Sequence, residues 1–192
     1  MGRDKALLPL PSESSGSNAT FLSAAIHSFN QVADLVIVVV GKNETTLAPI
    51  IYGQGAFLVR NPRPEDGQFS SLQIGLQEVL NRGRDSAMIT LVDRPPAAIT
   101  TLQMLKDSFA DATSRGKWAV VPQKAGKHGH PIVIGREMIE AFLKAPITTN
   151  AREIEHKHES HIEYIEVDDP RVVTNINTPE DYVQLSSTEL NQ

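Results

Sequence analysis

The sequence predicts an α/β fold built on a largely parallel sheet. Short β-branched runs alternate with segments whose apolar residues recur at helical spacing, a pattern typical of strand–helix–strand units. The run at residues 35–40 has no polar interruption, as expected of a strand that is covered on both faces. With 192 residues, the chain has the length of one domain.

The strands are expected at intervals along the whole chain. The run at 35–40 ends at Gly41, where the apolar pattern stops. The other candidates are short and aliphatic, and they lie at residues 56–60, 87–92, 119–121, 131–134, 162–167 and 171–174. Because helical patterns lie between many of them, most neighbouring strands are expected to run parallel.

Helices are expected where apolar residues repeat with helical spacing. These segments are residues 21–29, 72–80, 102–109 and 138–143. A last helix begins after Thr178, a suitable N-cap, with Pro179 at its first position. The composition of residues 11–18 predicts a flexible loop. We find no repeat or linker, so residues 1–192 are expected to form a single domain.

The composition excludes several classes of function. A net charge of −5 argues against nucleic acid or an anionic membrane as the main partner, and 5% aromatic residues argue against stacking on single strands. The chain has no cysteine, which excludes disulfides, thiolate catalysis and cysteine zinc sites. No apolar run approaches the length of a membrane span, and no signal peptide is recognisable. A cytoplasmic protein is therefore expected.

One candidate site residue is an acid that follows a strand. In open α/β sheets, ligands bind outside the carboxyl ends of the strands. Asp93 directly follows the strand at 87–92 and precedes Arg94 and a pair of prolines. A carboxylate held there suits Mg²⁺, which takes one or two such oxygens together with substrate phosphates. A helix cap or a turn explains the same acid equally well.

Two further segments place small or polar residues after strands. Residues 61–76 combine Gly67, a pair of serines and a helix start, and their backbone amides can approach a base or a phosphate. A plain helix cap is the simpler interpretation of this segment. Asn175 and Asn177 precede the last helix, where they either ligate a cation or close the turn.

The histidines favour substrate contact or surface positions over metal binding. His128 and His130 are two residues apart in an extended segment, so their side chains point to opposite faces. Their loop is either a substrate contact or a solvated hairpin tip. His156, His158 and His161 fit a polar surface better than a metal site. Lys5 is a surface charge unless a phosphate is brought to it.

Taken in order, these segments resemble the motifs of the MobA-like NTP transferases, a family that contains the molybdenum cofactor cytidylyltransferases and guanylyltransferases. Residues 2–10 resemble the segment after the family's nucleotide-binding turn. The other matching segments are 67–76, 93–95, 129–131 and 175–181. The resemblance covers almost the whole chain. It implies a three-layer, Rossmann-like (GT-A-like) nucleotidyltransferase fold with a mostly parallel central sheet.

The sequence departs from the family pattern in three places. The family's first strand and glycine-rich turn do not precede Met1, so the domain is expected to be incomplete at its N-terminus, with a start at an internal methionine favoured over a true loss. Arg94 stands between the aspartate and the proline, where the family usually has glutamine or another residue. Asn175 and Asn177 stand where cytidylyl-type members more often have aspartates. Gly41 and the Gly-His-Pro segment nevertheless lean towards the cytidylyl type.

The resemblance implies a Mg²⁺-dependent nucleotidyltransferase. It would transfer a nucleoside monophosphate, CMP in preference to GMP, from CTP or GTP to a phosphorylated acceptor such as molybdopterin cofactor, with release of pyrophosphate. A molybdoenzyme is a candidate partner. The implied catalytic residues are Lys5 and Asp93, with Asp93 and Asn175 as metal ligands and His130 at the acceptor. The implied nucleotide contacts are Lys5, Asn61, Gly67, Ser71 and Gly75.

Two other functions remain open at this point. One is a non-catalytic relative that binds a nucleotide or a partner protein. The other is a nucleotidyltransferase that acts on a sugar phosphate or a polyol phosphate.

Overall fold

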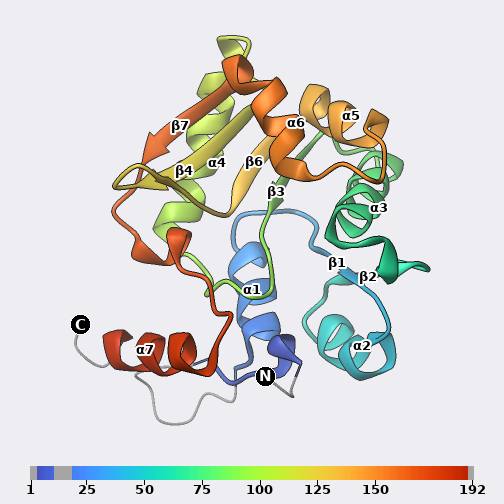
Figure 1. The fold of residues 1–192 in the computed structure, drawn as a ribbon, viewed down its shortest axis with the longest axis vertical. Coiled ribbons are helices and arrows are strands. Elements are labelled where there is room, and N and C mark those ends of the chain that lie inside the picture. Colours follow the sequence, from blue (N-terminus) through green and yellow to red (C-terminus); the bar gives the residue numbers. More distant parts are fainter. Residues whose placement is uncertain (1–3, 11–18, 190–192) are drawn as a thin grey trace.

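The computed structural model describes residues 4–10 and 19–189, so the loop predicted at 11–18 and the first residues of the segment 2–10 lie outside the described part. The strands form two sheets (Figure 1). In the smaller one, β1 (Ile37–Val40) pairs in parallel with β2 (Phe57–Arg60). The larger sheet has the order β3–β6–β4–β5, with β7 also paired to β4. Its strands are β3 (Ser86–Ile89), β4 (Ala119–Lys124), β5 (Lys127–His128), β6 (Ile132–Gly135) and β7 (Ile162–Glu166).

The prediction of a mostly parallel sheet is wrong for the larger sheet. β7 runs parallel to β4, but β5 and β6 run antiparallel to β4, and β6 runs antiparallel to β3. The cause is the short connection from β4 to β5. Only Ala125 and Gly126 lie between them, both with positive φ, whereas a parallel pair needs a crossover of about a dozen residues or more.

The segment 171–174 is also not a strand as predicted. Residues Pro170–Val173 form a short 3₁₀ helix, η4. Pro170 fixes the backbone at its first position, and the Asp169 carboxylate accepts a hydrogen bond from the Arg171 N–H at 3.0 Å. The aliphatic side chain of Val172 is buried nonetheless, so its apolar character reflects packing and not strand pairing.

Helices cover both faces of the larger sheet (Figure 1). Side chains of β4 alternate between the two faces: Val121 lies in the core with Phe142, and Val120 packs with Leu105. The first of these faces is covered by α3, α5 and α6, and the second by α4. The helices are α1 (Phe21–Asn30), α2 (Glu44–Gly53), α3 (Gln68–Asn81), α4 (Ile99–Ser114), α5 (Arg136–Lys144), α6 (Ala151–Lys157) and α7 (Pro179–Glu189). None of the described helices combines the length and apolar composition needed to cross a membrane.

Helix α3 joins the two sheets. Among the described residues, β1 and β3 each pair with a neighbouring strand along one edge only. On α3, a Cβ at Gly75 would lie 2.9 Å from Val39 Cγ2 of β1, while Leu72 packs into the core that includes Ile89 of β3. The absence of a side chain at Gly75 therefore lets α3 pack closely against β1.

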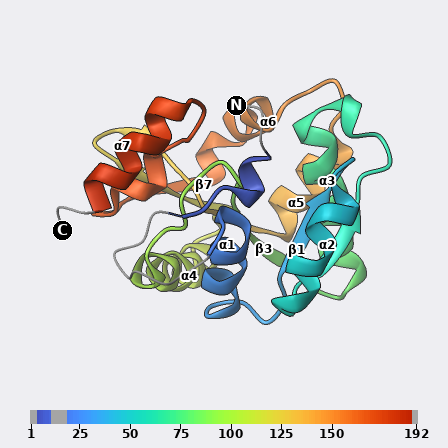
Figure 2. The same cartoon turned by 90° about the horizontal axis from the view of Figure 1, so that it is seen from below.

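Helix α7 lies beside the described N-terminal segment (Figure 2). The Tyr182 hydroxyl donates a hydrogen bond to the Pro9 carbonyl at 2.7 Å, and Phe21, Ile176 and Leu185 form a small apolar core there. This packing brings residues from the two ends of the sequence to the end of β3, where the candidate site lies.

Candidate functional site

Asp93 lies at the centre of the candidate site, in the loop that follows β3. The Ile176 N–H donates a hydrogen bond to the Asp93 backbone carbonyl at 2.8 Å, which holds the segment before α7 against this loop. One carboxylate oxygen, Oδ2, lies 3.6 Å from Lys5 Nζ. The other, Oδ1, is buried and has no hydrogen-bond partner among the described residues. Because an unpartnered buried acceptor is costly, this oxygen is suited to a cation or a ligand donor.

Lys5 reaches Asp93 from the N-terminal segment. It begins the short helix η1 (Lys5–Leu7), which Asp4 caps by accepting a hydrogen bond from the Ala6 N–H at 3.0 Å. The same carboxylate accepts a hydrogen bond from Asn43 Nδ2 at 2.6 Å, which ties η1 to the loop after β1. Lys5 Nζ donates to Asn177 Oδ1 at 3.0 Å. The ammonium group therefore sits between a carboxylate and an amide oxygen.

The Val172 carbonyl in η4 organises the other side of the site. It accepts hydrogen bonds from the His130 N–H at 2.8 Å and from Arg94 Nη1 at 3.2 Å. A Cβ at Gly129 would lie only 2.4 Å from this oxygen. The close backbone approach explains the glycine, and the two hydrogen bonds fix the segment before β6 against the loop after β3.

His130 is uncharged at neutral pH. Burial, together with the positive charge of Arg94, lowers the pKa of His130 to about 4. Its Nδ1 lies 3.4 Å from the Ile89 carbonyl, so the neutral ring is placed with Nδ1 as the donor. His130 therefore offers the site a neutral hydrogen-bonding group.

The buried neutral state of His130 predicts a pH-dependent stability. The unfolded chain takes up a proton on this residue below pH 6.5, but the folded chain does so only near pH 4. Acid therefore favours the unfolded state in this window, by up to about 1.4 kcal/mol per pH unit. Urea unfolding of His130→Gln should show a shallower loss of stability between pH 6.5 and 4 than the unsubstituted chain. The exposed His27→Gln is the control, and an unchanged slope for His130→Gln would contradict the assignment.

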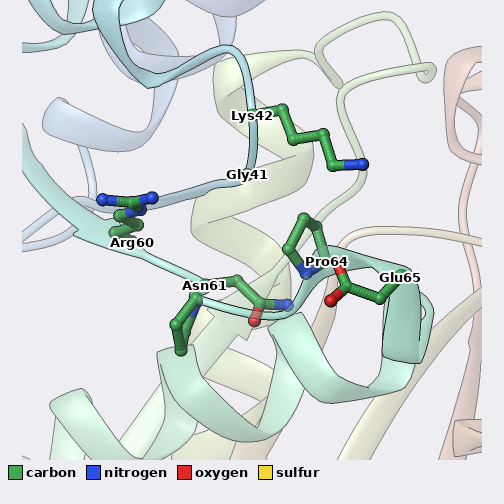
Figure 3. Close-up of a pocket in the computed structure, with 7 residues that line it drawn as sticks. Gly41, Lys42, Arg60, Asn61, Pro64 and Glu65 are labelled. Carbon is green, nitrogen blue, oxygen red and sulfur yellow. The ribbon is translucent and has the colours of Figure 1, made fainter.

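A groove opens between the ends of β1 and β2, with a volume of about 400 Å³. Figure 3 shows Lys42 extended over Pro64 and Glu65, with Arg60 on the other side. The lining residues are Gly41, Lys42, Arg60, Asn61, Pro62, Pro64 and Glu65. Its rim thus carries two cations, of which Arg60 Nε lies 3.4 Å from Glu44.

Asn61 braces the start of α3 beneath this groove. It is buried, and its Nδ2 donates to the hydroxyls of Ser70 at 2.8 Å and Ser71 at 2.9 Å. Its Oδ1 accepts the Arg63 N–H at 2.9 Å, and the Ser70 hydroxyl donates to the Gly67 carbonyl at 2.7 Å. The side chain of Asn61 therefore already has hydrogen-bond partners within the protein. Gly67 and Ser71 belong to the same hydrogen-bonded segment at the start of α3.

These contacts do not include Asn175, His158 or His161. Asn175 is exposed in the loop before α7, and Asn177 is the asparagine that contacts Lys5. The His161 ring stacks on Trp118 with centroids 4.0 Å apart, and the His158 ring lies 5.0 Å from the same ring. In the part of the chain that the structure describes, no three histidine, aspartate or glutamate side chains gather to hold a metal ion.

Motif reasoning missed two parts of this arrangement. Lys42 and Arg60 line the groove, and the only signal for them is that each stands at or beside the end of an aliphatic run. The contact between Lys5 and Asn177 spans 172 positions of sequence, and no local pattern reports it.

Comparison with known proteins identifies a family, a relative and two solved structures that agree with one another. The family description "MobA-like NTP transferase domain" matches residues 1–162. The molybdenum cofactor cytidylyltransferase of Escherichia coli (strain K12) is 24% identical over 187 residues, which covers 95% of this chain and 87% of that protein.

Two solved structures share the fold. The manganese complex of Rv0371c from Mycobacterium tuberculosis H37Rv superposes with a TM-score of 0.74 and 23% identity, covering 97% of this chain and 93% of that one. Molybdopterin-guanine dinucleotide biosynthesis protein A from Archaeoglobus fulgidus gives a TM-score of 0.70 with 14% identity, covering 100% and 93%.

Proposed function

Because the chain belongs to the MobA-like NTP transferase family and is thus a nucleotidyltransferase, we propose that it transfers CMP, in preference to GMP, from the nucleoside triphosphate to a phosphorylated acceptor of the molybdopterin cofactor type. The observation that carries this proposal is the buried, unbonded Oδ1 of Asp93, with the Lys5 ammonium 3.6 Å from the other carboxylate oxygen and the Arg94 guanidinium close enough to interact with the carboxylate. Such a group of charges suits phosphate chemistry, which needs positioning and charge neutralisation. The preference for CMP is supported by the similarity to the E. coli cytidylyltransferase.

We propose Mg²⁺ as the cofactor, held by Asp93 and by Asn175. The donor set is made of hard oxygens, which Mg²⁺ prefers, and Asn175 directly precedes Ile176, which is bonded to the Asp93 carbonyl. When bound, the cation neutralises charge on the phosphates. The manganese complex of Rv0371c supports a divalent ion in this fold.

The residues of the chain position the reacting groups. An oxygen of the acceptor phosphate attacks the α-phosphorus in line and forms the new P–O bond, while the bond to the bridging oxygen of the β-phosphate breaks and pyrophosphate leaves. Lys5 contacts the triphosphate and stabilises the charge that gathers on the leaving group. No general base is required, because the nucleophile is already an anion. The base and ribose lie in the groove between β1 and β2, beside Gly67 and Ser71, whose segment is bonded to Asn61. Gly75 supports this site indirectly, because its close packing on β1 holds α3 against that strand.

Titration with CTP and with GTP, each with and without Mg²⁺, tests the proposal. We expect Mg²⁺-dependent binding of CTP that is tighter than binding of GTP. A folded protein that binds neither nucleotide would overturn the proposed function.

Replacing Lys5 with alanine should weaken Mg²⁺–CTP binding by about 10-fold or more, because a charge-assisted contact to the triphosphate is lost. Isothermal titration measures the effect directly. Lys144→Ala is the matched control, because Lys144 is exposed on α5 and pairs with Glu140. An unchanged affinity of the Lys5 variant would refute its role.

A further inference from the structure

Arg94 is a positive charge whose hydrogen-bonding capacity is largely unused. In the part of the chain that the structure describes, its guanidinium has the Val172 carbonyl as acceptor at 3.2 Å, and its Nε is buried with no acceptor. A guanidinium carries several fixed N–H donors and keeps its charge in proteins. Burial lowers the pKa of Arg94, and the charge of Asp93 opposes that shift. The side chain as a whole is half-buried, but a buried N–H donor such as Nε is costly unless a ligand completes it.

Arg94 and Lys5 are anchored near Asp93 by different parts of the fold. Lys5 is anchored through Asp4 to Asn43, in the loop after β1. Arg94 is anchored to Val172 in η4 and acts electrostatically on His130, just before β6. The two cations are thus held by different contacts: Lys5 through Asp4 and through Asn177, and Arg94 through η4.

The proposed reaction is an in-line transfer at phosphorus. The attacking and leaving oxygens lie on opposite sides of the reacting phosphorus. With Lys5 on the leaving group, the attacking phosphate needs a cation of its own. Arg171 on η4 is already paired with Asp169. Arg94, in contrast, lies close to Asp93, and its Nε has no acceptor among the described residues.

We propose that Arg94 binds the phosphate of the acceptor and thereby selects phosphomonoesters as the acceptor class. This inference rests on the proposed function and adds a specificity-determining residue to it. A guanidinium matches a phosphate dianion through paired N–H donors, which a lysine ammonium does not reproduce. Arg94 holds the acceptor phosphate beside Asp93 for attack on the α-phosphorus.

A purely structural role for Arg94, as a clamp on the Val172 carbonyl, makes a different prediction. Loss of a clamp lowers stability and disturbs every ligand of the site to a similar extent. Loss of a phosphate ligand weakens binding of the acceptor phosphate and leaves the nucleotide in place. The experiment therefore measures both ligands on the same variants.

The probe is methyl phosphate, which is a phosphomonoester without an acceptor body. Its binding is followed by ³¹P NMR in the unsubstituted chain, Arg94→Met, Arg94→Lys and the control Arg84→Met, an exposed arginine paired with Asp34. Arg94→Met should weaken methyl phosphate binding by about 10-fold or more, with Arg94→Lys in between, because lysine keeps the charge without the paired donors. Arg84→Met should bind as the unsubstituted chain does. Affinity for Mg²⁺–CTP should fall much less than affinity for methyl phosphate in the Arg94 variants, and it should not change in Arg84→Met.

Each other outcome overturns the inference. If the unsubstituted chain does not bind methyl phosphate, or if Arg94→Met binds it equally well, Arg94 is not the phosphate ligand. If Arg94→Met loses binding of CTP together with binding of methyl phosphate, Arg94 has a structural role as a clamp on the Val172 carbonyl. If the methionine variant does not fold, Arg94→Lys provides the same comparison. Absence of CTP binding by the unsubstituted chain is a separate result, because it refutes the proposed function itself.

Discussion

Asp93→Ala is expected to reduce Mg²⁺-dependent turnover by about 10²–10³-fold, the size of effect seen when one preorganised electrostatic group is removed from an active site. The reason is that this carboxylate is the proposed ligand of the cation, and its Oδ2 lies 3.6 Å from Lys5 Nζ. The fold should survive, because the hydrogen bond from Ile176 is made to the backbone carbonyl of Asp93 and its Oδ1 has no partner among the described residues. Pyrophosphate release measures turnover, and urea unfolding measures stability.

The matched control for this prediction is Asp107→Ala. Asp107 is an exposed acid on α4 that accepts a hydrogen bond from the neighbouring Gln103, so its loss should leave turnover unchanged. Equal turnover in Asp93→Ala and the unsubstituted chain would show that Asp93 is not a ligand of the metal ion. A variant that unfolds would be replaced by Asp93→Asn, which keeps the size of the side chain and removes its charge.

Gly129→Ala is expected to destabilise the fold by about 2–4 kcal/mol, because it combines overpacking with the loss of a buried hydrogen bond. The added Cβ would lie 2.4 Å from the Val172 oxygen and 2.8 Å from its carbonyl carbon. Both are backbone atoms, so η4 must move. That movement displaces the Val172 carbonyl, to which the His130 N–H and Arg94 both donate hydrogen bonds. Binding of the phosphorylated acceptor substrate should therefore weaken along with the stability of the fold.

Gly53→Ala provides the comparison for this glycine. Gly53 ends α2, and an added Cβ would meet nothing within 4 Å. Its substitution should change the free energy of unfolding by less than about 1 kcal/mol. Urea unfolding measures the free energy of unfolding of both variants. Equal values would show that a side chain at position 129 does not clash with the backbone of η4.

Local patterns predicted the elements whose formation depends on local physics. The uninterrupted aliphatic run gave β1, and the start of α7 follows the predicted cap, with the Thr178 hydroxyl accepting the Asp181 N–H at 3.1 Å. Helix α2 was not predicted, because Pro49 and two threonines interrupt its apolar spacing. The direction of the strands in the larger sheet was also missed, since it depends on the turn at Ala125 and Gly126 and not on the strands themselves.

The same distinction applies to the site. Asp93 was singled out because polar residues that follow a buried strand gather at one edge of a sheet, and the structure places its carboxylate 3.6 Å from Lys5 Nζ. Its role as a metal ligand stays a prediction. The pairing of Lys5 with Asn177 depends on the packing of α7 against the N-terminal segment, which no local pattern contains. Asn61 and Gly75 have packing roles that motif reasoning does not distinguish from ligand contact.

Nucleotidyl transfer is tested by measuring pyrophosphate release from CTP in the presence of Mg²⁺ and molybdopterin cofactor, with GTP in a parallel reaction. We expect pyrophosphate in equal amount to a CMP–acceptor product, dependent on both Mg²⁺ and the acceptor, and slower product formation with GTP. Tight Mg²⁺-dependent binding of CTP with no pyrophosphate and no CMP–acceptor product would contradict the proposed transfer.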